Sequence, residues 1–154
     1  MKLIVASDPD GGIGYNNKLP WSRIQGDLPR FKKLTSGKIV VMGRNTWDSL
    51  PVKPLPNRTN YVVTSNPHSL PHIPGLYGIT DLNTLAHFND AACIIGGARL
   101  INSVWHLITS VNLSRTFTKY TCDTFIDLLQ LPKEFSLTYD EVNTDHTYEI
   151  WNRK

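Results

Sequence analysis

Short apolar runs alternate along most of this chain with segments of helical spacing. The runs at Leu3–Ala6, Ile39–Met42, Tyr61–Thr64 and Ala92–Ile95 have the length and composition of buried strands, and Leu76–Ile79 is a further candidate. Strands that are apolar on both faces need cover on both sides. The pattern therefore predicts a mostly parallel central sheet with helices packed against it.

Amphipathic helical segments fill the connections between these runs. They are Asp27–Leu34, Asn45–Leu50, Leu82–Phe88 and Ala98–Leu107, and Asp81 is placed to cap the third of them. After residue 109 the pattern changes, because apolar and polar residues alternate in Ser110–Thr118, Phe135–Val142 and Thr147–Trp151. Such alternation is typical of antiparallel strands. We predict one α/β domain over residues 1–154, with about eight strands, an antiparallel C-terminal edge and about four helices.

Composition restricts the class of function. The 154 residues carry a formal net charge of +3, which slightly favours small anionic ligands. The densest basic segment, Arg30–Lys33, is more typical of the solvated face of a helix than of a nucleic-acid-binding surface. No apolar stretch is long enough for a signal sequence or a bilayer span. Cys93 and Cys122 are too few for a disulfide framework, and Cys93 lies in an apolar run. We therefore expect a reduced, cytoplasmic protein without nucleic-acid or membrane partners.

Candidate phosphate-binding residues follow three of the predicted strands. Gly43–Thr46 follows the second strand, Ser65 follows the third, and Gly96–Arg99 follows the strand at 92–95. In a parallel sheet these carboxyl ends meet at one edge, where ligands bind. Free amides at the helix starts, together with Arg44 and Arg99, would hold phosphate. The three segments together predict a phosphorylated dinucleotide across the strand ends.

Two other motifs give weaker signals. Gly11–Gly14 looks like a phosphate-binding turn, but no helix and no Gly-Lys-Ser/Thr follows it, so a flexible lid is favoured. His68 and His72 have helical spacing, but the surrounding prolines exclude a helix, and the other histidines lie in separate elements. No metal site is predicted.

Asp27 is the most informative acid. It stands at the start of a predicted helix, before Leu28 and Pro29, and the local sequence favours a role as helix N-cap. The alternative is that Asp27 shares a helix face with Leu28 and Phe31. A carboxylate among apolar side chains could bind a heterocycle that carries an N–H beside an amino group.

Several motifs occur together in the order and near the spacing of one enzyme family. They are Leu19-Pro20-Trp21, Asp27-Leu28 with Phe31-Lys32 and Thr35, Val41 to Leu50, Pro54 to Arg58, and Ile95 to Arg99. In this combination the chain resembles dihydrofolate reductase over essentially its whole length. The resemblance favours the functional interpretation of Asp27.

The resemblance implies NADPH-dependent reduction of 7,8-dihydrofolate to tetrahydrofolate, a reaction of one-carbon metabolism, by a monomeric enzyme. Hydride would reach pterin C6, and N5 would be protonated by Asp27 or by water. Asp27 would hold the 2-amino group and N3 of the pterin, with Trp21 and Leu19 as further catalytic residues. Arg58 would pair with the α-carboxylate of the glutamate tail. The remaining implied substrate residues are Val5, Ala6, Leu28, Phe31, Leu50, Ile95 and Ser114.

The resemblance also implies a cofactor site. Arg44, Ser65 and Arg99 would lie near the adenosine 2′-phosphate and favour NADPH over NADH. Thr46 and the Gly96-Gly97 turn, whose peptide is typically cis in this family, would lie along the pyrophosphate. The segment Gly11–Trp21 would be a lid over the nicotinamide. The remaining implied cofactor residues are Ala6, Ile13, Gly14, Leu19, Gly43, Asn45, Thr64, Ile95, Ala98, Leu100 and Ile101.

Some positions depart from the commoner family pattern. One extra residue separates Trp21 from Asp27, Ser114 replaces a threonine that supports the acid, Asn45 replaces a basic residue, Ile101 replaces an aromatic one, and Cys122 replaces a glycine. These changes are expected to affect cofactor affinity and the lid more than the chemistry.

Two other functions remain open. A riboflavin-pathway reductase of the same fold would lack the Leu-Pro-Trp and Asp-Leu…Phe motifs. A catalytically silent binding protein of this fold would be expected to have lost at least one of Asp27, Arg44, Arg58 or Gly96-Gly97, and all are present. Their retention favours the enzyme.

Overall fold

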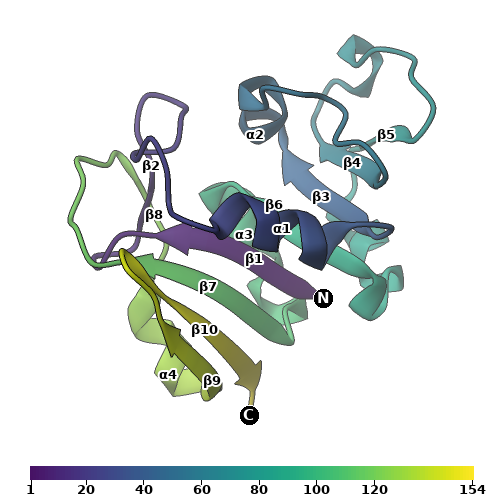
Figure 1. Ribbon diagram of the computed structural model, residues 1–154. Helices are drawn as coiled ribbons and strands as arrows, with labels where there is room; N and C mark the ends of the chain where they lie inside the picture. The colour runs from purple at the N-terminus through teal and green to yellow at the C-terminus, as the bar shows by residue number, and fades with distance from the viewer.

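The computed structural model describes residues 1–154. Its centre is an eight-stranded sheet in the order β5-β4-β3-β6-β1-β7-β10-β9 (Figure 1). The strands are β1 (Lys2–Ser7), β3 (Ile39–Gly43), β4 (Thr59–Val63), β5 (Leu76–Ile79), β6 (Ala92–Gly96), β7 (Ser110–Thr116), β9 (Phe135–Val142) and β10 (His146–Arg153). Neighbours are parallel except where β10 pairs with β7 and β9. The predicted α/β fold with an antiparallel C-terminal edge is confirmed.

Helices cover both faces of the sheet (Figure 1). The α-helices are α1 (Asp27–Thr35), α2 (Arg44–Ser49), α3 (Ala98–Val104) and α4 (Leu131–Glu134), and the 3-10 helices are η1 (Pro67–Ser69), η2 (Leu82–His87), η3 (Asn89–Ala91), η4 (Trp105–Leu107) and η5 (Leu128–Gln130). Alternation along the strands divides the core in two. Ile4 and Met42 pack with α1 and α2 on one face, whereas Leu3 and Val41 pack with α3 on the other.

Several predicted elements differ in kind from those observed. The segment predicted as a helix at 82–88 is the 3-10 helix η2, although Asp81 caps it as predicted by accepting a hydrogen bond from the Asn83 amide at 2.9 Å. The segment predicted as one helix at 98–107 is α3 followed by η4. The expectation that residues 110–118 form an antiparallel strand is wrong for one neighbour, because β7 runs parallel to β1 and opposes only β10.

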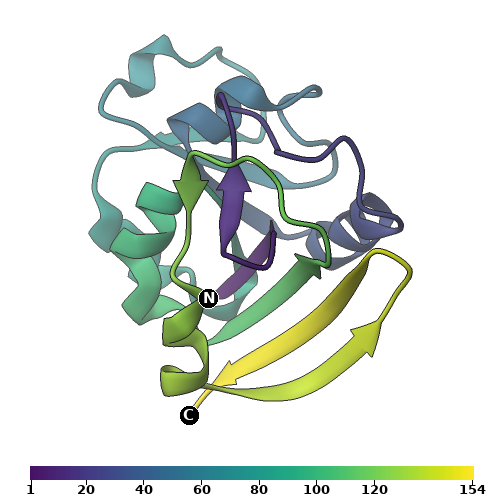
Figure 2. The same ribbon diagram turned by 90° about the vertical axis from the view of Figure 1, so that its left-hand side faces the viewer.

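The long loop after β1 contains a strand that the sequence did not predict. β2 (Gly12–Gly14) pairs with β8 (Thr124–Phe125) in a separate two-stranded sheet beside β1 (Figure 2). Gly11 permits this close approach, because its φ is +88° and an added Cβ would lie 2.3 Å from the carbonyl oxygen of Ile126. The buried Asp8 carboxylate fixes the turn by accepting hydrogen bonds from the amides of Gly12 (2.8 Å) and Tyr120 (3.1 Å).

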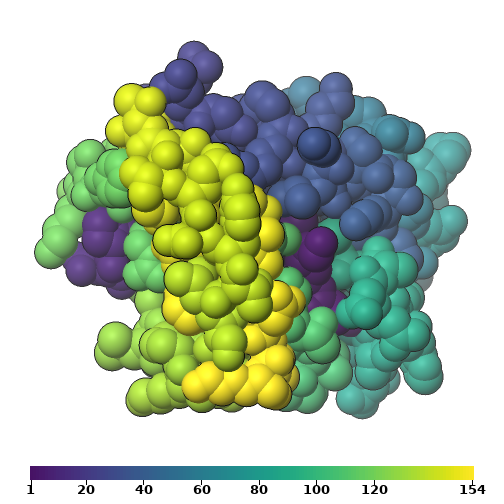
Figure 3. All heavy atoms as spheres, turned by 60° about the horizontal axis from the view of Figure 1, so that its bottom comes forward, coloured from purple at the N-terminus to yellow at the C-terminus, as the bar shows by residue number.

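The β9–β10 hairpin reaches across to the segment that precedes α1. Asp145, at the tip of the hairpin, accepts a hydrogen bond from the Gln25 amide at 2.9 Å. Figure 3 shows the yellow hairpin lying beside the dark blue segment that leads into α1. The C-terminal strands thus contact an N-terminal loop. None of the helices combines the length and the hydropathy that a membrane crossing requires.

Candidate active site

The carboxyl ends of β3 and β6 meet at three glycines. A Cβ added to Gly43 would lie 3.8 Å from the amide nitrogen of Gly97, and one added to Gly96 or Gly97 would lie 3.4 or 3.5 Å from Thr46 Oγ1. The Gly96–Gly97 peptide is cis, as the resemblance implied. Two strand ends and the first turn of α2 therefore bring backbone and a hydroxyl together at the predicted edge of the sheet.

A β-bulge next to these glycines displaces Ile95. Val41 pairs with Ile94 and Met42 pairs with Gly96, so Ile95 is left over in the ladder. Ile95 is half-buried against the core cluster on the α1 side of the sheet. Partly buried apolar residues from three other segments pack against the same cluster, and these are Phe31, Leu34, Leu50 and Leu55. The predicted substrate residues Phe31, Leu50 and Ile95 thus border one apolar surface.

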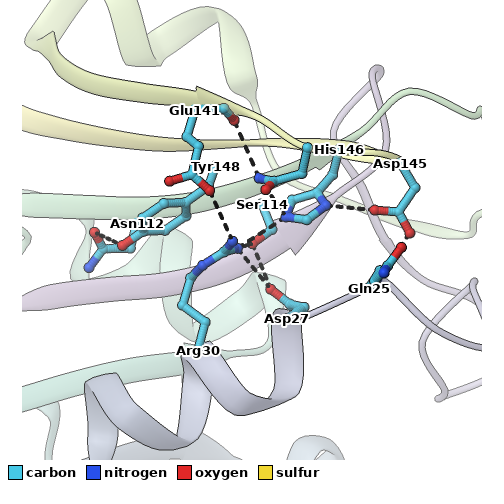
Figure 4. A network of polar contacts seen from close by, with 10 residues as sticks. Gln25, Asp27, Arg30, Asn112, Ser114, Glu141, Asp145, His146 and Tyr148 are labelled. Carbon is cyan, nitrogen blue, oxygen red and sulfur yellow. Dashed lines mark hydrogen bonds and ion pairs between the residues drawn. The ribbon is translucent and has the colours of Figure 1, made fainter.

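Asp27 does not cap the helix that it begins. The N-cap is Gly26, whose φ of +80° starts the helix without a side-chain hydrogen bond. The Asp27 carboxylate instead accepts a hydrogen bond at its Oδ1 atom from the Ser114 hydroxyl of β7, at 2.6 Å (Figure 4). The N-cap interpretation is therefore wrong. Asp27 is also less buried than expected, since 24% of its side chain is exposed.

The helix face of Asp27 differs in one respect from the prediction. Phe31, one turn further along α1, packs with the core as expected, but Leu28 is 71% exposed. Residues i and i+4 share a helix face, whereas i and i+1 diverge by about 100°. The Leu28 side chain therefore points toward solvent next to Asp27 and does not pack into the core with Phe31.

Arg30 lies on the inner side of α1, where the prediction of a solvated basic segment is wrong. Its side chain is 20% exposed and its guanidinium contacts Ser114 and His146 (Figure 4), whereas Lys32 and Lys33 are exposed. Sequence reasoning did not find Arg30 or His146 as site residues. The only local signal was the spacing of an arginine three residues after Asp27.

A second cation lies at the opposite end of α1. Arg58 donates hydrogen bonds to the Thr35 hydroxyl (3.0 Å) and the Pro56 carbonyl (2.8 Å), and partial burial lowers its pKa below the usual arginine value. Buried Asn60 holds the preceding loop by bonding both the amide and the carbonyl of Leu55. Asp27 and Thr35 are separated along the helix axis by roughly 12 Å. Asp27 and Arg58 are thus held at the two ends of α1.

The predicted cofactor residues fall into two groups. Arg44, at the start of α2, donates to Asp48 at 3.2 Å and to Ser69, while the exposed Arg99 and Ser65 side chains have no partner within the chain. Asn45 is exposed and Thr64 accepts a hydrogen bond from the Asn66 amide. Other cofactor candidates pack into the core on the α3 side, which leaves mainly their backbone for a ligand, and these are Ile13, Ala98, Leu100 and Ile101. The predicted substrate residue Val5 packs on the same side. Neighbouring Ile4, which the sequence analysis overlooked, is the β1 side chain on the Phe31 side.

The predicted lid contacts the loop around β8. Asp123 accepts a hydrogen bond from the Asn16 amide at 3.0 Å, and its own amide donates to the Gly14 carbonyl at 2.9 Å. The bond from Asn16, and then that from the Thr124 hydroxyl, hold the pKa of Asp123 below its usual value. Cys122 packs directly against Gly12, so its side chain fills space beside the lid strand.

Trp21 and Leu19 differ in burial at the far end of the lid. Trp21 is 6% exposed and packs edge to face on Tyr120, with ring centres 5.7 Å apart. Leu19 is 62% exposed. Ala6, at the end of β1, pairs with Ser114 in the sheet. Trp21 therefore anchors the lid, while Leu19 presents an unburied apolar side chain.

Comparison with known proteins agrees with this arrangement. The sequence model of the dihydrofolate reductase family matches residues 1–152. A dihydrofolate reductase type 8 of Escherichia coli is 37% identical over 163 aligned residues, which cover 100% of this chain and 96% of that protein. The dihydrofolate reductase of Buchnera aphidicola is 30% identical over 152 residues, or 99% of this chain and 94% of that protein. Such similarity over the full length implies a nicotinamide cofactor, and the chain belongs to the dihydrofolate reductase family.

Proposed function

We propose that this protein reduces 7,8-dihydrofolate to 5,6,7,8-tetrahydrofolate with NADPH. The observation that carries the proposal is the Asp27 carboxylate, which Ser114 holds through Oδ1 while Oδ2 has no partner in the chain. A carboxylate fixed in this way accepts two parallel hydrogen bonds from a ring N–H and a neighbouring amino group. The pterin ring carries this pair at N3 and its 2-amino group.

The two ends of α1 match the two ends of the substrate. Asp27 would hold the pterin, and Arg58, roughly 12 Å along the helix, would pair with the glutamate α-carboxylate. Between them Phe31 and Leu50 border one apolar surface, and Leu28 is exposed beside it. Burial of an aromatic ring between such side chains gives about 25 cal/mol for each Å² of apolar surface removed from water. Ala6 and Ile95 would line the inner end of this surface with Ile4 beside them, whereas the Val5 side chain packs on the α3 side of the sheet and would offer only its backbone.

The strand-end glycines fit the cofactor. Gly43, Gly96 and Gly97 place no side chain beside Thr46, and Gly43 and Gly97 are partly exposed, as close approach of a pyrophosphate requires. Arg44 and Arg99 add guanidinium groups, and the exposed Ser65 hydroxyl follows β4, the strand beside β3. The bound cofactor would supply the hydride that reaches pterin C6. An adenosine 2′-phosphate would draw on the arginines, which is why we favour NADPH over NADH.

The lid would exclude water from the reacting atoms. The segment from Gly11 to Trp21 is held at one end by the β2–β8 pairing and at the other by the packing of Trp21 on Tyr120. Leu19, between these anchors, is exposed and free to cover a ligand. Exclusion of water strengthens the electrostatic effect of Asp27 on the pterin. A monomeric state and a cytoplasmic location stay predictions, to be tested by light scattering and by cell fractionation.

The function is tested by mixing the protein with dihydrofolate and NADPH and following the loss of NADPH absorbance. We expect Asp27→Asn to lower kcat/KM at neutral pH roughly 100-fold or more, since a positioned acid contributes on that scale. Asp140→Asn is the matched control, because Asp140 is exposed on β9. Folded protein without turnover above background would overturn this function, and no turnover of any such substrate would favour a silent binding protein of this fold. Turnover of a pyrimidine of the riboflavin pathway instead would favour the reductase of that pathway.

A further inference from the structure

Arg30 lies at the centre of a polar network built from elements far apart in the sequence (Figure 4). Its Nη1 atom is 3.1 Å from His146 Nε2, 3.4 Å from Ser114 Oγ and 3.9 Å from Asp27 Oδ1. Both Arg30 and Asp27 are shielded, with 20% and 24% of their side chains exposed. An arginine so placed acts on the carboxylate that would hold the pterin.

The chemistry of the guanidinium fixes the direction of each hydrogen bond. Arginine donates hydrogen bonds and accepts none. The Ser114 hydroxyl must therefore accept from Arg30, and its own proton points to Asp27 Oδ1, 2.6 Å away. For the same reason His146 Nε2 must accept from Arg30, which puts the ring proton on Nδ1, 2.7 Å from Asp145 Oδ1. Arg30 thus sets the donor direction of Ser114 and the tautomer of His146.

Neighbouring strands hold the guanidinium in place. Its central carbon lies 4.1 Å from the ring centre of Tyr148, whose hydroxyl donates to Asn112 of β7 at 3.1 Å. Glu141 of β9 lies 4.0 Å from Nη2 of Arg30 and is 45% exposed. Stacking on an aromatic face and contact with a carboxylate both restrain an arginine.

The charges around Arg30 define its electrostatic role. The groups that face it are Asp27 of α1, Glu141 of β9, and His146 and Tyr148 of β10, with Asp145 behind the histidine. Asp27 is the less exposed of the two facing carboxylates, so the positive charge is least screened there. The Arg30 guanidinium therefore forms its best-shielded ion pair with Asp27, beside the Ser114 hydroxyl.

We propose that Arg30 is a positioning residue for Asp27, which orients Ser114 as a donor to Oδ1 so that Oδ2 is left for the pterin. This inference rests on the proposed function. It assigns Arg30 a role that is exerted through the Ser114 hydroxyl. It also links Asp27 to the tip of the β9–β10 hairpin through His146 and Asp145.

The test compares Arg30→Met with Arg30→Lys, each assayed for kcat and KM with dihydrofolate at pH 7. In Arg30→Met we expect KM to rise about tenfold with a smaller change in kcat, since the Ser114 hydroxyl is no longer oriented toward Oδ1. Arg30→Lys keeps a donor for Ser114 without the planar guanidinium, so its KM should rise less than that of Arg30→Met. Lys33→Met is the matched control, because Lys33 is exposed on the same helix.

Folate binding, followed by quenching of tryptophan fluorescence, gives a readout independent of turnover. The dissociation constant for folate should rise about tenfold in Arg30→Met and less in Arg30→Lys. An unchanged KM and an unchanged folate affinity in Arg30→Met would overturn the role of Arg30.

A double-mutant cycle with Ser114→Ala tests the route through the hydroxyl. The loss caused by Arg30→Met should be smaller in the Ser114→Ala background, because the two residues act on one carboxylate oxygen. Full additivity would exclude that route. If Arg30→Met does not fold, by circular dichroism, Arg30→Lys and the same cycle built on it decide the question. Wild-type turnover separates the two proposals: absent turnover overturns both, whereas normal turnover with an unaltered variant overturns only this one.

Discussion

Glu149 provides the sharpest test of how the β7–β10 pair is held. Its side chain is 10% exposed, and its two oxygens accept hydrogen bonds from Arg115 at 2.9 and 3.0 Å, from Thr147 at 2.8 Å and from Trp151 at 2.9 Å. Glu149→Gln puts an amide N–H group where every partner is a donor. Breaking a buried pair costs about 3–5 kcal/mol, and the amide retains one acceptor oxygen. We therefore expect the free energy of unfolding to fall by about 2–3 kcal/mol.

The measurement is urea denaturation followed by far-ultraviolet circular dichroism, because Trp151 fluorescence would change with the mutation itself. An m-value equal to that of the wild type would show that Glu149→Gln exposes a similar area of surface on unfolding. Asp10→Asn is the control, since the Asp10–Lys119 pair spans 3.3 Å with 57% and 71% of the side chains exposed and should contribute less than about 1 kcal/mol. The double variant Glu149→Leu with Arg115→Met should recover most of the loss. A loss below about 1 kcal/mol in Glu149→Gln would refute the reasoning.

Three further predictions concern the cofactor and the lid. Arg44→Ala should raise KM for NADPH about tenfold more than KM for NADH, as measured by initial rates with each cofactor, and equal losses would exclude contact with the 2′-phosphate. Gly11→Ala should lower both the melting temperature and the turnover, since its Cβ would lie 2.3 Å from the Ile126 carbonyl oxygen, and wild-type values for both would contradict this packing. The bond from the Gln25 amide and then that from His146 hold the pKa of Asp145 below its usual value, so this contact is complete above about pH 4 and weakens as the pH falls further. Amide-exchange protection factors of the Gln25 segment at pH 6 and pH 3 would test this, and equal protection would count against it.

Local patterns predicted the elements that are defined by their own residues. The bounds of β5 and β9 agree with the predicted ranges, and β1, β3, β4 and β6 differ by one or two residues at their ends. The inner strands β1, β3, β4 and β6 are mostly apolar, as burial on both faces requires, whereas β5 and β9 lie at the two edges of the sheet and are partly exposed. The glycines after β3 and β6 could also be predicted from local sequence, because a backbone that must approach a phosphate closely cannot carry a side chain there.

Contacts between distant segments could not be predicted in this way. Arg30 meets Ser114 and His146 across 84 and 116 residues of sequence, and Gln25 meets Asp145 across 120. No periodicity within α1 distinguishes an inward arginine from the solvated lysines that follow it. The β2–β8 pairing was missed for a related reason, since a three-residue strand with two glycines shows no alternation.

Alternation of polar and apolar residues is common in strands with one face in solvent, but the polar residues of β7 are buried, and their burial is the clearest sign of a site. Asn112, Ser114 and Thr116 are all less than 5% exposed, on the strand face opposite the core residues Val111 and Leu113. Buried polar groups require partners. Asn112 is bonded by Tyr148 and Ser114 by Arg30, and Ser114 in turn bonds Asp27. β7 has hydrogen-bonded neighbours on both sides, β1 and β10, and its polar side chains are buried. Its polar face must therefore lie against other polar groups inside the protein. Here those groups are the polar network around Asp27. The buried polar residues of β7 therefore mark where the site lies.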